Sequence, residues 1–341
     1  MSEQAINVLA DPRPPTPAPS YTIIRDEKTL AEWIAAARKK GVVAFDTETT
    51  SLDSMTAELV GFSLCVDAGM ACYVPLGHKA SGVGIQDSGS SLDLFDPKPE
   101  TRSLEPNQIP LPAALALLNP LLTDDAVLKI GHNIKYDMQI MYRYGADISP
   151  IEDTMLLSYC LHAGEHGQGM DELAEKYLGH KNISFDDVTG TGKKRLRFDE
   201  VEIEKAGQYA AEDADVTMRL YDYFKPQLAA QKLISVYESM ERPLIPVLAR
   251  MERAGIKVNV GMLAGLSKDF ETRMFALEKE IHILAGADFN VGSPKQLGEI
   301  LFEKLQLPGG RKSAKTGAYS TDNDVLEELA EAGHALPAKI I

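Results

Sequence analysis

The sequence has few cysteines and no apolar run long enough to cross a bilayer. Only three of its 341 residues are cysteine, which argues against a disulfide scaffold and indicates a reducing compartment. The longest apolar candidate, residues 111–122, is cut by prolines and falls short of the roughly 18 residues of a membrane span. The first 20 residues lack the basic-then-apolar pattern of a secretion signal. We therefore expect a soluble, cytoplasmic protein without a membrane partner.

A basic excess is also missing. The chain carries 50 acidic against 35 basic residues, a net charge of −15, whereas proteins that bind phosphate backbones usually carry a basic surplus. That rule concerns local patches, and an enzyme that collects metal-binding carboxylates adds acid of its own. The charge therefore lowers the expectation of a nucleic-acid partner without removing it. An apolar fraction of 44% and a charged fraction of 25% are those of a globular protein.

The first 225 residues predict an α/β domain behind a proline-rich tail or linker at residues 1–20. Short apolar strands come early and helices alternate with them later, which favours a mixed sheet flanked by helices. Glycine stops, turn residues and a capping-box pair set the expected boundaries. The predicted elements are a helix at 28–40, a strand at 42–46, a hairpin of 58–66 and 70–75, a long loop at 78–110, a helix at 111–122, a strand at 126–130, a helix at 134–144, a glycine-interrupted helical region at 153–178, and a helix from the pair Asp199/Glu202 to about 224.

Beyond residue 225 the pattern becomes helical. Long amphipathic stretches cover about 229–253, 261–285 and 294–305, the last with Ser293 as its cap and Pro294 at its first position. We place a domain boundary near residue 225. The sequence ends at Ile341 inside an apolar pattern with no stop signal, so we expect a truncated chain.

The strongest local signal is a pair of carboxylates at the end of an apolar strand. Asp46 and Glu48 are two apart, so on a strand they share one face while Thr47 points away. Two such charges ~4 Å apart repel by about 4 kcal/mol at an effective dielectric constant of about 20. A divalent cation would turn that repulsion into binding, and oxygen ligands suit Mg²⁺ or Mn²⁺. Two solvated acids at a strand terminus are the simpler alternative.

Two further acids lie in helical contexts. Asp137 follows Asn133 at the start of a predicted helix, where it could simply favour the helix dipole. Tyr209 and Asp213 are four apart and share a helix face, and the small Ala210 and Ala211 could let that helix pack closely on the sheet. A surface acid with a tyrosine packed behind it is the plainer interpretation.

In this order the three pieces resemble the motifs of the DEDD exonucleases, in the variant that carries tyrosine. The runs NIKYD (133–137) and YAAEDADVT (209–217) look like the proofreading domain of the bacterial family A DNA polymerases. The likeness continues into that family's thumb, through ERPLIPVLARMERAGIKV (241–258), SPKQL (293–297) and DVLEELAEAGHALPAK (324–339). It covers about residues 21–341. It implies a ribonuclease H-like exonuclease domain at 21–225 and a partial, helical thumb at 226–341, with the remainder of the polymerase missing.

What the resemblance implies for chemistry is a two-metal phosphodiesterase. One Mg²⁺ or Mn²⁺ would be held by Asp46, Glu48 and Asp213, and the other by Asp46 with Asp137 acting through water. One cation would lower the pKa of the attacking water and the other would stabilise the leaving 3′ oxygen. Tyr209 would orient the water, with Glu48 assisting.

The resemblance also implies contacts to the DNA strand. Leu52 would wedge against the terminal base, Phe185 would offer a stacking surface, and Asn133 and Tyr136 would lie near the strand. His132 stands where the family often has glutamine, which could alter contacts to the terminal nucleotide. The loop at 78–108 is longer than the family pattern, and no role is assigned to it.

Two other clusters carry weaker signals. Four basic residues follow Gly192, and they could guide the phosphates of a single strand or form a solvated loop; they are Lys193, Lys194, Arg195 and Arg197. His162 and His166 have helical spacing, but glycines surround them and the pattern is not the helical His-Glu-x-x-His of zinc enzymes, which disfavours zinc.

The sequence therefore predicts a metal-dependent 3′–5′ exonuclease that acts on single-stranded or frayed DNA 3′ ends at the nucleoid, releases nucleoside 5′-monophosphates and serves proofreading in DNA replication and repair. No polymerase active site is expected, so a primed template should not be extended. Two alternatives stay open. One is a DNA-binding fragment with weak catalysis, and the other is an exonuclease that trims RNA with the same acids.

Overall fold

The computed structural model describes residues 19–79, 107–313 and 317–341. The chain forms two compact units, which divide between Gly255 and Ile256. The predicted tail at 1–20 lies almost wholly, and the predicted long loop largely, outside the described residues. No helix among the described residues is both long and apolar enough to cross a membrane.

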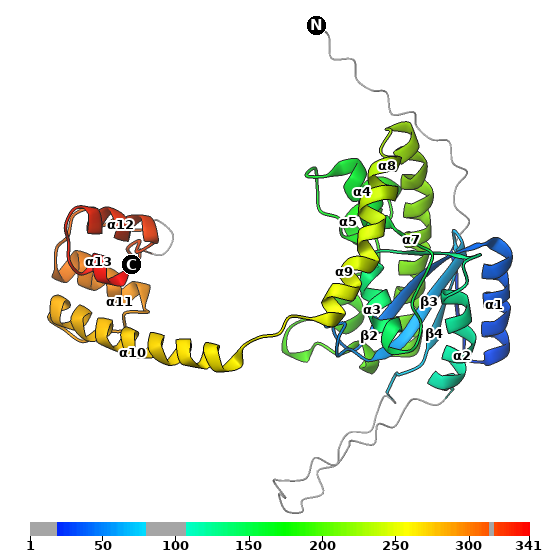
Figure 1. Cartoon of the computed structure of the whole chain (residues 1–341), viewed down its shortest axis with the longest axis horizontal. Coiled ribbons are helices and arrows are strands. Elements are labelled where there is room, and N and C mark those ends of the chain that lie inside the picture. The colour runs from blue at the N-terminus through cyan, green and yellow to red at the C-terminus, as the bar shows by residue number, and fades with distance from the viewer. Residues whose placement is uncertain (1–18, 80–106, 314–316) are drawn as a thin grey trace, which may run out of the picture. The chain divides into compact units, whose positions relative to one another are not determined.

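The first unit is built on a six-stranded mixed sheet of order β1-β4-β3-β2-β5-β6 (Figure 1). β2 and β4 are antiparallel to β3, whereas the pairs β1–β4, β2–β5 and β5–β6 are parallel. The predicted hairpin and the strand after Gly41 are confirmed, and β2 is longer than expected. The strands are β1 (Ser20–Ile23), β2 (Val42–Thr49), β3 (Leu59–Asp67), β4 (Met70–Pro75), β5 (Leu128–Gly131) and β6 (Ile151–Asp153).

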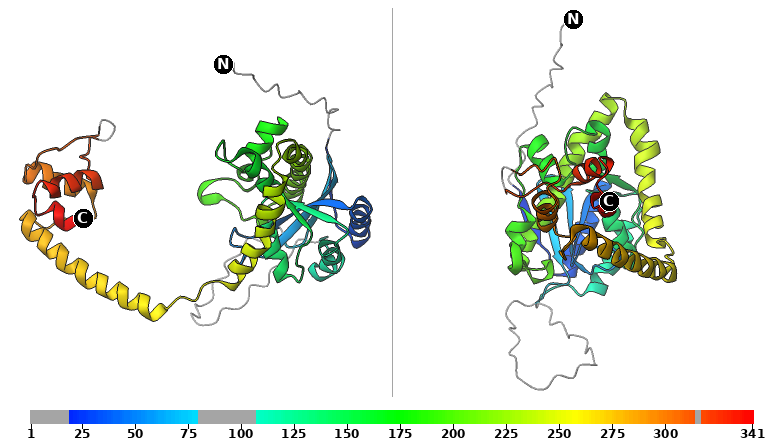
Figure 2. Two further views of the ribbon diagram at one scale, coloured as in Figure 1. Left: turned by 45° about the horizontal axis from the view of Figure 1, so that its top comes forward. Right: turned by 90° about the vertical axis from the view of Figure 1, so that its left-hand side faces the viewer.

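Helices cover both faces of this sheet, as Figures 1 and 2 show. Alternate residues of β2 enter different cores. Val43 and Phe45 pack with α1, α2 and α3, while Ala44 packs against Ala211 and Ala214 of α7, so small residues do bring that helix close to the sheet. The helices of this unit are α1 (Glu27–Lys40), α2 (Leu111–Leu122), α3 (Lys135–Arg143), α4 (Thr154–His162), α5 (Met170–Leu173), η1 (Ala174–Leu178), α6 (Phe185–Thr189), η2 (Gly192–Lys194), η3 (Phe198–Glu200), α7 (Ile203–Ala230), α8 (Ile234–Val236), η4 (Tyr237–Glu241) and α9 (Arg242–Ala254).

The first unit extends past the boundary expected near residue 225. Helix α7 continues through Pro226 to Ala230, and the chain then returns to the sheet domain through α9. There Ile245 is buried in the main core, and the buried Gln139 of α3 donates to the carbonyl of Ala249 (3.1 Å) and to Glu252 (3.0 Å). This packing joins residues 226–255 to the first unit.

The predicted capping pair Asp199/Glu202 does not form. Asp199 is buried and accepts from Arg197 at 2.9 and 3.1 Å, and Lys79 lies 3.2 Å from it. Helix α7 instead begins after Glu202 without a side-chain cap. A carboxylate buried in this way requires cationic partners, and Arg197 and Lys79 take the place of the helix N–H groups that it was expected to receive.

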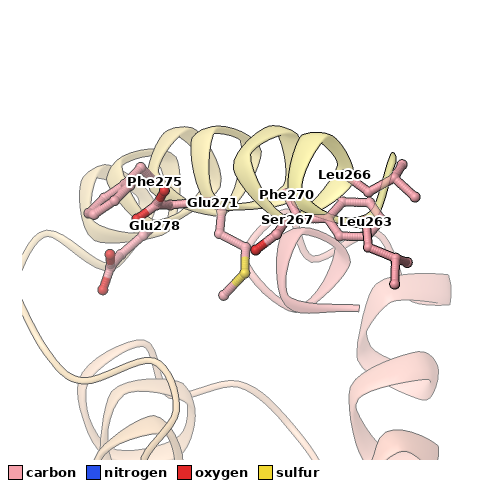
Figure 3. Close-up of a pocket in the computed structure, with 8 residues that line it drawn as sticks. Leu263, Leu266, Ser267, Phe270, Glu271, Phe275 and Glu278 are labelled. Atoms are coloured by element: carbon pink, nitrogen blue, oxygen red, sulfur yellow. The ribbon is translucent and has the colours of Figure 1, made fainter. Parts of the chain in front are cut away.

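The second unit consists of helices around its own small core. Its elements are α10 (Val260–Ala285), α11 (Pro294–Gly298), η5 (Glu299–Lys304), α12 (Asn323–Glu331) and α13 (Pro337–Ile340). Ser293 caps α11 as predicted. Along α10, Leu263, Leu266, Phe270 and Phe275 line an open pocket on the helix surface (Figure 3).

Candidate active site

Three carboxylates from β2 and α7 meet on one face of the sheet. Asp46 and Glu48 follow Ala44 at alternate positions, so they share the face of β2 that Ala44 turns towards α7. Asp213 projects from α7, whose alanines let it lie close to the strand. One carboxylate oxygen from each of the three lies within 4.8 Å of the other two. Asp46 and Glu48 therefore lie on one side of the strand, as expected.

Asp137 reaches the same strand from α3 but is not part of this triad. Strand β5 pairs with β2 only as far as Ala44, so the backbone N–H of Thr47 lies beyond that ladder. The Asp137 carboxylate accepts from this N–H at 2.9 Å and from the Thr47 hydroxyl at 2.6 Å. Asp137 therefore takes the place of a missing strand neighbour, which fixes its position in the first turn of α3.

Burial makes these acids costly as anions. It raises the pKa of Asp46 to about 7. It raises the pKa of Glu48 well above its usual range, and the charges of Asp46, Asp213 and Asp137 raise it further. Glu48 Oε1 is buried without a hydrogen-bond partner among the described residues. Converging carboxylates with an unsatisfied inward oxygen fit a hard divalent cation such as Mg²⁺ or Mn²⁺.

Tyr209 lies beside the triad, one turn before Asp213 on α7. Its side chain is hydrogen-bonded to the Asp213 carboxylate, and burial together with nearby carboxylates raises the pKa of the phenol, so it stays protonated. Its ring packs edge-on against Phe185, with centroids 6.1 Å apart, and against Phe198 at 5.9 Å. These contacts hold the hydroxyl at the carboxylates.

Two of the expected strand contacts are open to solvent. Leu52 is 95% exposed, and Phe185 is 41% exposed with the Arg195 guanidinium 5.3 Å from its ring centroid. Tyr136 donates to the carbonyl of Ser51 at 2.6 Å. This bond ties the segment that carries Leu52 to α3.

Two more of the five expected contacts, Asn133 and His132, flank the start of α3. Asn133 is exposed and has a left-handed φ of 61°. His132 is only partly exposed, and its Nδ1 lies 2.8 Å from the Thr154 hydroxyl, while its Nε2 is buried without a partner among the described residues. Burial lowers the pKa of this imidazole to about 4, so it is neutral at physiological pH.

The basic loop is partly neutralised. Arg195 pairs with Asp186, and Arg197 with the buried Asp199. Lys193 and Lys194 are exposed and form no ion pair within the described parts of the chain. Of the four cations expected to guide phosphates, only these two lysines are therefore unpaired.

Two positioning residues were not anticipated from the sequence. One is Thr47, which holds Asp137. The other is the buried Asp153, which receives the backbone N–H groups at the starts of α3 and α4 at 2.9–3.3 Å, namely those of Asn133, Ile134, Met155 and Leu156. Only an Asp before a predicted helix could have suggested the second role.

A mixed sheet flanked by helices, with acids of β2 and α7 meeting on one face and an acid of α3 held by the same strand, is the architecture of a ribonuclease H-like α/β exonuclease domain. A family model described as 3′–5′ exonuclease matches residues 21–229, and one described as DNA polymerase family A matches residues 260–341. The chain belongs to the 3′–5′ exonuclease family found in bacterial DNA polymerase I.

Individual relatives agree with this assignment. The chain is 52% identical over 331 residues to a DNA polymerase I of Rhizobium leguminosarum and 42% identical over 325 residues to one of Pseudomonas aeruginosa. Each alignment covers 94% of this chain and 31% or 33% of the relative, so the chain spans about a third of their length. In fold it is similar to the POL domain of Pol1 from M. smegmatis, solved with DNA primer-template and dNTP (TM-score 0.65, 23% identity, 94% of this chain and 47% of that one).

Proposed function

We propose that this chain is a divalent-metal-dependent 3′–5′ exonuclease that removes nucleoside 5′-monophosphates from single-stranded or frayed DNA 3′ ends. The observation that carries the proposal is the convergence of Asp46, Glu48 and Asp213 within 4.8 Å. Burial of these acids raises their pKa values, and one of their oxygens has no partner. Apart from a cation, little would stabilise such an arrangement at neutral pH.

The residues that would hold the metals follow from this arrangement. Asp46, Glu48 and Asp213 would bind one cation directly, and Asp46 would share a second with Asp137, which acts through water. When bound, the two cations neutralise the carboxylates and supply the Lewis acidity that hydrolysis of a phosphodiester requires. Thr47 would keep Asp137 in place while the substrate is exchanged.

Tyr209 would position the attacking water. Its phenol remains protonated, so it can donate or accept a hydrogen bond without competing for a cation. Asp213 fixes the hydroxyl from one side, and the rings of Phe185 and Phe198 fix the tyrosine ring from the other. Glu48 would accept a hydrogen bond from the same water.

The terminal nucleotides would lie between Leu52 and Phe185. Leu52 is an exposed apolar side chain that can wedge against a base, and Phe185 backed by Arg195 offers a face for stacking. Asn133, Tyr136 and His132 would contact the same strand from the start of α3.

The match of residues 260–341 to family A DNA polymerases supports DNA over RNA as the substrate. It also supports a role beside the rest of such a polymerase, in proofreading at the nucleoid of the cytoplasm.

The decisive experiment measures mononucleotide release from a 3′-labelled DNA single strand with Mg²⁺ or Mn²⁺. We expect metal-dependent release that Asp213→Ala abolishes and that Asp222→Ala, a change at an exposed acid of the same helix, leaves intact. A matched RNA strand should be degraded more slowly. DNA binding without hydrolysis under either metal would refute the proposal and favour a catalytically weak DNA-binding fragment.

A further inference from the structure

A second group of metal-ligating side chains lies at the end of α4. His162 is the last residue of that helix, so the helical spacing of His162 and His166 does not bring them together. The chain instead turns through Gly164, whose φ is +79°, and the N–H of Glu165 returns to the carbonyl of His162 at 3.2 Å. This turn places the two imidazole rings 5.7 Å apart between centroids. A tight turn, and not a helix, therefore brings the two histidines together.

The ligand atoms of this group are already close. One nitrogen from each histidine and one carboxylate oxygen of Glu165 lie within 4.8 Å of one another, and His162 Nδ1 is 3.5 Å from Glu165 Oε2. Zinc binds such atoms at about 2.0–2.2 Å, so ligands of a tetrahedral ion are about 3.4 Å apart. Small side-chain rotations would be enough to complete the shell.

The surroundings prepare both imidazoles for this role. His166 Nδ1 is 2.6 Å from the carbonyl of Gly167, which places the proton there and leaves the lone pair on Nε2. That Nε2 accepts a hydrogen bond from the Tyr177 hydroxyl at 2.6 Å. An incoming cation would take the place of this hydroxyl. The His162 ring stacks on Tyr177, with centroids 5.1 Å apart.

We propose that His162, Glu165 and His166 bind one divalent cation of the zinc class, with water in the fourth position. Two imidazoles and a carboxylate select borderline ions such as Zn²⁺, Co²⁺ or Ni²⁺ over Mg²⁺, which prefers oxygen ligands alone. The site is therefore chemically distinct from the carboxylate triad. It would brace the glycine-containing turn that leads to Gln168, whose side chain donates to the carbonyl of His166 at 3.3 Å.

The test is calorimetric titration of Zn²⁺ into the full chain carrying Asp213→Ala, which disables the carboxylate site. We expect saturable binding of one Zn²⁺ that excess Mg²⁺ does not compete away. His166→Gln should weaken it by more than about tenfold, because even partners outside the ligand shell contribute that much. Since His162 contributes to packing, Glu165→Gln serves as the second variant. Its side chain is 62% exposed, so loss of binding there cannot reflect misfolding.

A matched control is available in the second unit. His282 Nδ1 lies 3.5 Å from Asp288 Oδ1, the same distance as in the proposed site but without a second imidazole. His282→Gln should leave Zn²⁺ binding unchanged. In addition, ¹⁵N NMR of the seven histidines should show zinc-dependent shifts at His162 and His166 only. Affinity within twofold of the parent chain after His166→Gln, or an equal loss after His282→Gln, would overturn the proposal.

Discussion

Helices α7 and α10 are of similar length but are used differently. Fifteen of the 28 residues of α7 are buried, among them Asp213, Glu212 and Asp215. Of the 26 residues of α10, only Ile281 and Ala285 are buried, and its apolar side chains line an open surface. Helix α7 of the first unit therefore has acidic side chains buried in a packed core. Helix α10 of the second unit has apolar side chains that no other described residue covers.

The candidate activity resides in the first unit. All four acids and Tyr209 lie in the first unit, and their neighbours come from β2, α3, α6, η3 and α7. The stability of α7 depends on packing against the sheet, while the first turns of α10 depend on local capping by Asn259, which accepts from the N–H of Met262 at 3.0 Å. This contrast leads us to expect large effects of changes in the first unit and small effects of changes on α10.

Ending the chain after Ala230 should destabilise the first unit severely, whereas ending it after Gly255 should not. The shorter chain loses the buried Tyr237 and Ile245, whose burial contributes about 3–6 kcal/mol together. It also loses the bond that the Asp153 N–H donates to the Tyr237 hydroxyl at 3.0 Å. Urea unfolding of both chains, with exonuclease assays, measures this. Equal stability would show that residues 231–255 are dispensable.

Glu48→Gln should stabilise the metal-free chain while it abolishes nucleotide release. Burial and three neighbouring acids raise the pKa of Glu48, so at neutral pH folding must protonate it. A side chain that does not ionise avoids this cost and should add about 1–3 kcal/mol to the free energy of unfolding. The matched change Glu271→Gln on the exposed face of α10 should alter it by less than about 0.5 kcal/mol. Urea titrations in EDTA compare the two, and a destabilised Glu48→Gln chain would contradict the cost assigned to this charge.

The two units should respond to pH with opposite signs in the absence of metal. Burial raises the pKa of Asp46 from 3.8 to about 7, so between these values the folded state binds more protons than the unfolded one. The first unit should therefore lose stability as pH rises through that range. Asp46→Asn should flatten this slope, which cannot exceed about 1.4 kcal/mol per pH unit for one group.

In the second unit, bonds from the Ser320 hydroxyl and the Val325 N–H lower the pKa of Asp322. The stability that Asp322 contributes is present at pH above its unfolded pKa of 3.8, and it is lost as the pH falls through the lower pKa of the folded state. Thermal unfolding of the chain between pH 3 and 8 should be monitored by amide exchange in each unit. This measurement separates the pH dependence of the first unit's stability from that of the second. Slopes of the same sign would show that other groups dominate one unit.

Phe270→Ala should have the smallest effect. Phe270 is 52% exposed on α10, so its loss should change the free energy of unfolding by less than about 0.5 kcal/mol and reduce the binding of an apolar dye. Phe45→Ala, at a fully buried ring in the first unit, should cost about 3–5 kcal/mol. If both substitutions lowered the free energy of unfolding by similar amounts, the result would show that the apolar face of α10 is covered in solution.

Elements with local signals were predictable from the sequence. Helix α1 ends at Gly41 with a left-handed φ of 76°, and the hairpin of β3 and β4 has its turn at Asp67–Met70. The alternation of Asp46 and Glu48 set their common face. Strands β1 and β6 were not predicted, because each has only three or four residues and lies at an edge of the sheet.

Long-range contacts account for the rest. Nothing local in Thr47 shows that it will hold Asp137, since the bond depends on β5 ending before that point. Asp199 does not cap α7 because it is buried and pairs with the remote Lys79 as well as with the neighbouring Arg197. His162 and His166 were set aside because glycines break the helix between them, yet the glycine turn is what brings their rings together.

Asp153 has a mechanical consequence. Because one carboxylate receives the first N–H groups of both α3 and α4, the starts of the two helices are anchored at a common point. Asp137 near the carboxylate triad and His162 at the end of α4 therefore lie on helices with a shared anchor, and loss of the Asp153 carboxylate would release both at once.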